Sequence, residues 1–129
     1  MNTLGFIPRS KKNTILIVED DADIGVFLQM VLTEETIYLV QHVLTGQQAL
    51  DAVLHTNPLL FLLDYQLPIM SGVLLYDILH RMPQFTHVPA LVMSANLPMA
   101  ELNKRHLIGI SKPFDLDVLI ATVKRLLDQ

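Results

Sequence analysis

Cysteine is absent from this 129-residue chain, and no hydrophobic run is long enough to cross a membrane. The lack of cysteine excludes a disulfide framework, a thiolate metal site and a cysteine nucleophile, and it is compatible with a reducing compartment. The apolar runs are short and interrupted, whereas a membrane helix needs about 20 consecutive apolar residues. The basic residues of the N-terminal segment follow its apolar patch, which is the wrong order for a signal peptide. We therefore expect a cytoplasmic protein that does not enter a membrane.

Positive charge is scarce and scattered. Nine Lys and Arg residues stand against 13 Asp and Glu residues, which gives a formal net charge of -4 and a pI near 5.6. Without a basic stripe, neither nucleic acid nor an anionic membrane surface is expected as a partner of this chain alone. A protein partner or a small anion held by a local site remains open, and the 51% hydrophobic composition is compatible with a homodimer.

Short buried runs alternate with helical patterns along the chain. The length suits one domain, which we place at residues 14–129 after a flexible leader at residues 1–13. Asp23 and Asp115 are predicted to cap the first and last helices, and Pro98 to lie near the first turn of a short fourth helix. Strands are predicted at Ile15–Val18, Tyr38–Leu44, Leu59–Leu63, Ala90–Met93 and Ile108–Ser111. This alternation predicts an α/β fold, a doubly wound five-stranded parallel sheet with helices on both faces.

Polar residues stand at or just past the carboxyl ends of several predicted strands. In a parallel sheet with right-handed crossovers these ends share one edge, where ligands bind. The residues so placed are Glu19, Asp20, Asp64, Ser94 and Lys112. Acids occupy the turn after the first strand in place of a Gly-rich loop, which disfavours the binding of a phosphate group there without a cation. The sequence therefore predicts that three acids and a lysine converge on a single spot.

Three close carboxylates repel one another unless a cation lies among them, and a hard divalent ion with oxygen ligands meets that need. We interpret Asp20 and Asp64 as direct ligands of Mg²⁺ or Mn²⁺. Glu19 would act through a water, and the backbone carbonyl near Gln66 would supply another oxygen. This hypothesis competes with a simpler one, because acids that follow a strand are commonly helix caps or turn formers.

Asp64 has a second possible role, since a carboxylate can attack phosphorus and form an acyl phosphate. Lys112 would then place a positive charge on the phosphoryl oxygens, and the hydroxyl of Ser94 would donate a hydrogen bond to them. The five histidines show no ligand spacing and are interpreted as surface or packing residues.

Four segments, in this order, resemble the receiver domain of two-component response regulators over roughly residues 14–128. They are Ile15–Asp21, Leu62–Gly72, Val92–Ala95 and Ser111–Phe114. The resemblance implies a flavodoxin-like sheet with strand order 2-1-3-4-5. It implies a phosphoacceptor and not an enzyme: Asp64 takes a phosphoryl group from a sensor histidine kinase or phosphotransfer protein, and Glu19 and Asp20 hold Mg²⁺. Ser94 would move toward that group, and a protein interaction surface would switch for an output partner or domain.

The chain departs from the family pattern at several positions. The interval between Ser94 and Lys112 is short, which predicts a shortened fourth helix, and Gly109 stands where the family usually has an aromatic switch residue. Ser71 replaces the usual Asp before the glycine. Two other functions stay open. One is a degenerate receiver that acts as a phosphorylation-independent interaction module, and the other is an aspartate-nucleophile phosphatase, which would need a second Asp where Gln66 stands.

Overall fold

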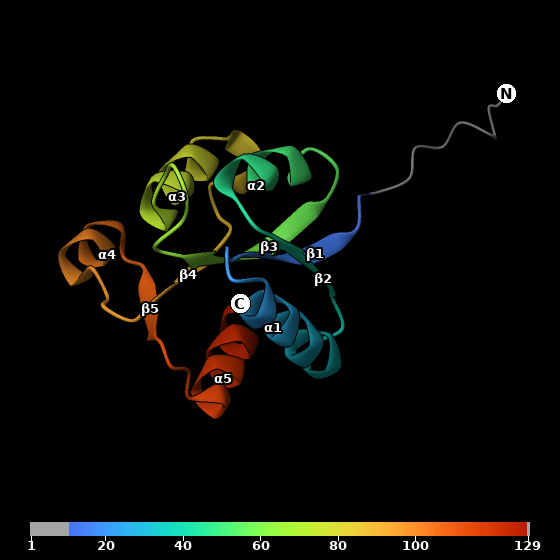
Figure 1. Ribbon diagram of the computed structural model, residues 1–129. Coiled ribbons are helices and arrows are strands. Elements are labelled where there is room, and N and C mark those ends of the chain that lie inside the picture. Colours follow the sequence, from blue (N-terminus) through green and yellow to red (C-terminus); the bar gives the residue numbers. More distant parts are fainter. Residues whose placement is uncertain (1–10, 129) are drawn as a thin grey trace, which may run out of the picture.

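The computed structural model describes residues 11–128, in which strands and helices alternate from end to end (Figure 1). The elements are β1 (Asn13–Val18), α1 (Ala22–Glu35), β2 (Leu39–Val43), α2 (Gly46–Ala52), β3 (Asn57–Asp64), α3 (Gly72–His80), the 3-10 helix η2 (Pro83–Phe85), β4 (Ala90–Ser94), α4 (Met99–Arg105), β5 (Ile108–Ser111) and α5 (Leu116–Leu127). Most of the predicted leader lies outside the described residues, and β1 includes Asn13. Within residues 11–128, no helix has both the length and the apolar character needed to span a bilayer.

The five strands form one parallel sheet in the order β2-β1-β3-β4-β5. At its centre, Ile17 of β1 pairs with His42 of β2 on one side and with Leu62 of β3 on the other. Because every pairing is parallel, the carboxyl ends of all five strands lie at the same edge of the sheet. This confirms the predicted α/β fold, its strand order and the shared edge on which the site hypothesis depends.

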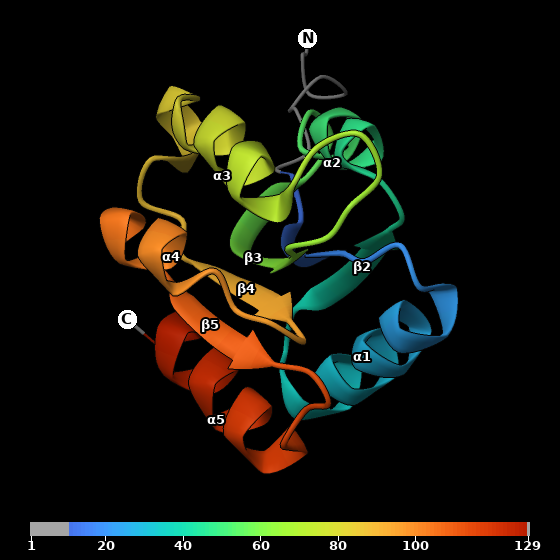
Figure 2. The same ribbon diagram turned by 60° about the vertical axis from the view of Figure 1, so that its left-hand side comes forward.

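Helices cover both faces of the sheet, with α2 and α3 on one side and α1 and α5 on the other (Figures 1 and 2). Successive strand residues point to opposite faces, so each central strand contributes to two cores. The core under α2 and α3 includes Leu16, Val18, Phe61 and Leu63. The core under α1 and α5 includes Ile15, Ile17, Leu60 and Leu62. The central strands are therefore apolar at consecutive positions, which is the pattern that identified them in the sequence.

The first helix is capped by a different residue from the one predicted. The Oδ1 atom of Asp21 accepts hydrogen bonds from the backbone N–H groups of Asp23, at 3.0 Å, and Ile24, at 3.1 Å. The prediction of Asp23 is therefore wrong, because the chain already turns into the helix two residues earlier. The cap of the last helix is as predicted, because Asp115 accepts from the backbone N–H of Val118 at 3.2 Å. Pro98 immediately precedes the short α4, near its first turn as expected.

The loop after β3 contains a strained residue. Ile69 has a φ of 72°, a region that β-branched residues rarely adopt, and the N–H of Met70 donates to the carbonyl of Pro68 across it at 2.8 Å. The side chain of Ile69 is fully exposed, so no packing offsets the strain. The other described non-glycine residue with a positive φ is His106, which ends α4 as left-handed residues commonly do.

Replacement of Ile69 by Gly is expected to raise the free energy of unfolding by about 0.5–1 kcal/mol, because the relief of strain exceeds the added entropy of the unfolded chain. The matched control is Ile37→Gly, which removes an equally exposed isoleucine from a backbone without positive φ. That variant should lose roughly 0.4–1 kcal/mol. Urea denaturation of both variants checks the difference, and equal effects of the two substitutions would show that Ile69 is not strained.

Candidate functional site

The carboxyl edge of the sheet is hollowed into a pocket of about 470 Å³. Four strands end there: β1, β3, β4 and β5. All six residues predicted for the site line this pocket: Glu19, Asp20, Asp64, Gln66, Ser94 and Lys112. The structure therefore brings together residues that span most of the chain, and it does so because parallel strands end at a common edge.

Three carboxylates meet in the pocket. Glu19, Asp20 and Asp64 each offer an oxygen, and these oxygens lie within 4.8 Å of one another. Glu19 is fully buried and Asp64 is 4% exposed, whereas Asp20 is open to solvent. Within residues 11–128 this is the one group of three or more potential metal-ligating side chains so close together.

Lys112 connects the far strand of the sheet to these acids. Its Nζ atom lies 2.6 Å from Oε1 of Glu19 and 3.4 Å from Oδ1 of Asp64. Burial of the lysine lowers its pKa, but the hydrogen bonds and charges of Glu19 and Asp64 outweigh burial and leave the pKa raised. Lys112 therefore remains a cation, and its shortest contact is with Glu19.

Asp64 has an unusual affinity for its proton. Burial, followed by the hydrogen bond and negative charge of Glu19, raises its pKa from 3.8 to about 7, although Lys112 acts in the opposite direction. One lysine thus does not neutralise the cluster. A hard divalent ion fits these residues, because every side-chain donor among the three acids is a carboxylate oxygen and a second cation would favour the charged form of Asp64.

The loop after Asp64 holds this carboxylate in place. The backbone N–H of Gln66 donates to Oδ1 of Asp64 at 3.3 Å. Gly72 lies so close that a Cβ there would overlap the backbone oxygen of Asp64, and its N–H donates to the carbonyl of Tyr65 at 2.9 Å. In the sequence, Gly72 stands out only as part of a motif; in the structure, the close packing of α3 against the end of β3 requires it.

Ser94 lines the pocket but is engaged with its own loop. Its hydroxyl donates to the carbonyl of Asn96 at 3.1 Å and accepts from the N–H of Asn96 at 3.1 Å. The side chain is nearly fully buried. A change of partner by this hydroxyl would therefore release the backbone of Asn96 in the loop before α4.

Side chains from two neighbouring segments fill the space beside Gly109. A Cβ at this position would lie 2.8 Å from Cδ1 of Leu102 and 2.9 Å from Cδ2 of Leu97. Leu102 is a buried residue of α4, and Leu97 belongs to the same loop as Asn96. No aromatic ring stands here, and two leucines occupy the space in its place.

His42, which the sequence indicates only as a surface or packing residue, contacts the backbone of the acidic turn. Its Nε2 atom lies 2.8 Å from the backbone carbonyl of Glu19. The sequence signal was its place on the strand predicted to lie beside β1, but sequence alone does not give the register between the two strands.

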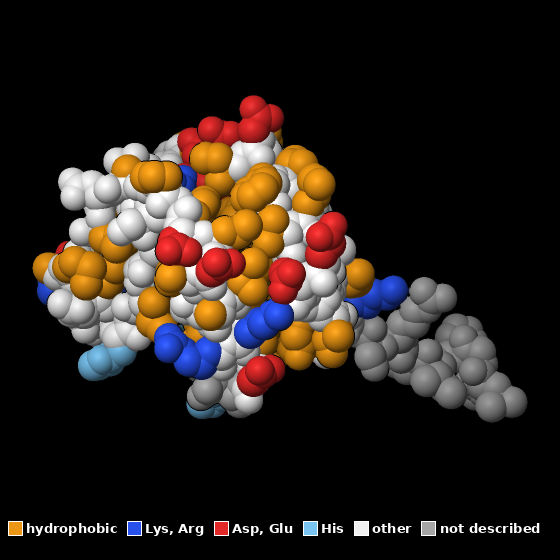
Figure 3. Space-filling model, turned by 90° about the horizontal axis from the view of Figure 1, so that it is seen from below, with side chains coloured by type: hydrophobic (Ala, Val, Ile, Leu, Met, Phe, Trp, Pro, Cys, Tyr) orange, Lys and Arg blue, Asp and Glu red, His pale blue; other side chains and the backbone are white. Residues whose placement is uncertain are grey.

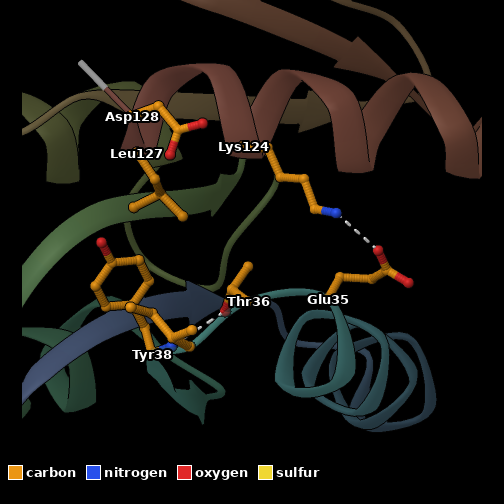
Figure 4. Close-up of a pocket in the computed structure, with 7 residues that line it drawn as sticks. Glu35, Thr36, Tyr38, Lys124, Leu127 and Asp128 are labelled. Atoms are coloured by element: carbon orange, nitrogen blue, oxygen red, sulfur yellow. Dashed lines mark hydrogen bonds and ion pairs between the residues drawn. The ribbon is translucent and has the colours of Figure 1, made fainter.

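Another pocket, of about 250 Å³, lies between the ends of α1 and α5 (Figure 4). Lys124 and Glu35 form an ion pair of 3.0 Å across it, with both side chains half-exposed. Its lining includes Thr36, Tyr38 and Leu127. This pocket holds two acids, Glu35 and Asp128, and its lysine is already paired with Glu35. The clustered carboxylates lie in the edge pocket instead, so the chemistry points to the carboxyl edge.

Comparison with known protein families gives a match over nearly the whole described chain. The response regulator receiver domain family matches residues 15–124. This range includes every residue of the edge pocket.

Individual proteins agree with this match. The chain is 36% identical over 118 residues to sporulation initiation phosphotransferase F of Bacillus subtilis, covering 88% of this chain and 92% of that protein. It is 31% identical over 123 residues to the sensor histidine kinase TmoS of Ectopseudomonas mendocina, covering 92% of this chain but only 12% of that protein. Among solved structures, a sensor protein from Polaromonas sp. JS666 superposes with a TM-score of 0.80 at 31% identity, covering 94% of this chain and 98% of that one.

The raised pKa of Asp64 makes stability depend on pH when no divalent ion is present. Between about pH 5 and pH 8 the carboxyl group of Asp64 binds more protons in the folded protein than in the unfolded chain. Its stabilising contribution is therefore lost as the pH rises through its pKa in the folded protein. The free energy of unfolding of the protein in EDTA should therefore fall over this range, relative to that of Asp64→Asn. Urea denaturation at several pH values measures the difference, and parallel curves for the two proteins would contradict the raised pKa.

Proposed function

This chain belongs to the response regulator receiver domain family, and on that basis we propose that Asp64 accepts a phosphoryl group in two-component signal transduction. A carboxylate oxygen of Asp64 attacks phosphorus and forms a P–O bond, while the P–N bond of a phosphohistidine breaks and the imidazole leaves with the electron pair and takes up a proton. The observation that carries this proposal is the position of Asp64 in the edge pocket, 3.4 Å from Lys112 and beside two further acids.

We propose Mg²⁺ or Mn²⁺ as the cofactor. Asp20 and Asp64 would bind the ion directly, Glu19 through a water, and the backbone carbonyl of Gln66 would complete the protein ligands. When bound, the ion neutralises charge on the transferring group. Lys112 pairs with Glu19 and Asp64, and it would contact the phosphoryl oxygens as a positive charge.

A histidine kinase or a phosphotransfer protein is the proposed donor. Two relatives, a sensor histidine kinase and a sporulation initiation phosphotransferase, support this class of partner. The surface beside the acids is also suited to a protein: Ile24 and Phe27 of α1 form a hollow of about 330 Å³ with Pro113 and Phe114. Seen from the side of α1 and α5, hydrophobic side chains gather next to acidic ones (Figure 3). A small phosphodonor alone would not need this apolar area.

The proposed output runs through the loop before α4. When the hydroxyl of Ser94 turns to a phosphoryl oxygen, it gives up both of its hydrogen bonds to Asn96. The loop can then move Leu97 away from Gly109, and with it the packing of Leu102 in α4. The C-terminal end of α4 stays fixed, because Arg105 forms a bidentate ion pair with Asp77 of α3 at 2.7 and 2.8 Å.

Two alternatives are kept for the test. A phosphorylation-independent interaction module would retain the acids without using them. The wild type should then show no response to Mg²⁺, and Asp20→Ala should behave in the same way. An aspartate-nucleophile phosphatase would turn over a phosphomonoester many times, although Gln66 lacks the carboxyl group that such an enzyme uses as general acid.

Acetyl phosphate with Mg²⁺ is expected to add one labile phosphoryl group, observed by intact-protein mass spectrometry. Asp64→Asn should add none, because an amide is not a nucleophile for phosphorus. The control Asp51→Asn removes an exposed acid of α2 and should behave as the wild type. An unchanged mass shift in Asp64→Asn would exclude Asp64 as the acceptor.

Leu97→Ala is expected to separate phosphorylation from its output. The variant keeps the edge pocket, so it should still be phosphorylated, but loss of the leucine removes the contact between the loop and Gly109. Backbone amide shifts of α4 on addition of beryllium fluoride and Mg²⁺ should therefore be strongly reduced. Leu54→Ala, at an exposed leucine outside the edge pocket, is the control. Full wild-type shifts in Leu97→Ala would exclude this route.

A further inference from the structure

We propose that His42 is a positioning residue for the acidic turn, holding the peptide between Glu19 and Asp20 so that the carboxylates converge on a divalent cation. The role of the cation rests on the proposed function, whereas the hold on the turn does not. No family motif in the sequence includes His42, and its contact arises from the pairing of β2 with β1.

Both backbone groups of Glu19 are bound by consecutive residues of β2. The N–H of Glu19 donates to the carbonyl of Val43 at 3.1 Å, and the carbonyl of Glu19 lies 2.8 Å from Nε2 of His42. A carbonyl can only accept, so Nε2 carries the hydrogen and donates it. The peptide that leads into Asp20 therefore cannot rotate without breaking a side-chain hydrogen bond.

Helix α1 contains a glycine that fits the imidazole ring. A Cβ at Gly25 would overlap Nε2 and Cε1 of His42, so any other residue there would force the ring out of its position. Glycine is a poor helix former, yet it stands within the first turns of α1, where its N–H donates to the carbonyl of Asp21 at 3.0 Å. The pairing of Gly25 with His42 gives this glycine a physical reason.

The acids of the turn differ in how they are held. The side chain of Glu19 is fixed by Lys112 at 2.6 Å and accepts from the N–H of Asp21 at 3.2 Å. Asp20 is exposed, and its backbone sets the point from which its side chain reaches the pocket. Groups that orient the ligands of a metal commonly change its affinity 10- to 100-fold when removed. His42 acts on Asp20 in this indirect way, through the carbonyl that precedes it.

The experiment compares His42→Ala, His42→Gln and the double variant Gly25→Ala/His42→Ala. Mg²⁺ affinity is measured from amide shifts during titration, and Tm is measured without the ion. We expect His42→Ala to weaken Mg²⁺ binding by about 10-fold. His42→Gln should stay close to the wild type, because the amide nitrogen of Gln can replace Nε2 as donor. His55→Ala, in the turn after α2, should change nothing.

The double variant separates positioning from packing. Its added methyl group fills part of the space left by the ring, so Tm should recover, but no donor to the carbonyl of Glu19 returns and Mg²⁺ binding should stay weak. Recovery of Mg²⁺ affinity together with Tm, or unchanged affinity in His42→Ala, would show that His42 is only a packing residue.

Failure of the proposed function gives a different result. If the wild type does not bind Mg²⁺, the claim about the cation is wrong. The amide shifts of Asp20 and Asp21 measured without metal then test whether His42 holds the turn. They should move in His42→Ala and stay near the wild-type values in His42→Gln. Unchanged amide shifts in His42→Ala would overturn the claim that His42 positions the acidic turn.

Discussion

The arrangement of the site depends on one electrostatic constraint, the repulsion among three carboxylates that the sheet brings to one edge. Glu19, Asp20 and Asp64 offer oxygens within 4.8 Å of one another, and Lys112 supplies a single compensating charge at 2.6 Å from Glu19. To do so, the lysine reaches from the end of β5 to β1, across the ends of β3 and β4. Burial and the remaining repulsion raise the pKa of Asp64 to about 7, which makes this residue responsive to any further positive charge.

Under the proposed function, the same edge separates into an input part and an output part. The input part consists of the acids and Lys112, held by hydrogen bonds and ion pairs between β1, β3 and β5. The output part begins at Ser94, whose hydroxyl is tied to Asn96, and continues to Leu97 over Gly109. Leucine side chains have more than one staggered rotamer, so contacts of Leu97 and Leu102 can serve where an aromatic ring is absent. An altered output part therefore does not require altered chemistry at Asp64.

Much of this could be predicted from the sequence, because buried parallel strands are apolar at consecutive positions and the polar residues that follow them must share an edge. That reasoning located Asp64 and Lys112, and the family resemblance supplied the strand order. It named Asp23 as the cap of the first helix where Asp21 is the cap, since both acids have the chemistry of a cap and the path of the chain decides. It also missed His42, because a contact between strands depends on their register. The strain at Ile69 depends on a dihedral angle, which residue type alone does not determine.

The most direct test of the central constraint is a ¹³C NMR titration of the carboxyl carbon of Asp64, with and without Mg²⁺. Without the ion the titration should report a pKa of about 7, compared with the ordinary value of 3.8. With saturating Mg²⁺ the apparent pKa should fall by more than about one unit, because the bound cation favours the charged form. A pKa near the ordinary value without the ion, or a titration that Mg²⁺ does not move, would contradict the account of a buried carboxylate cluster that requires a second cation.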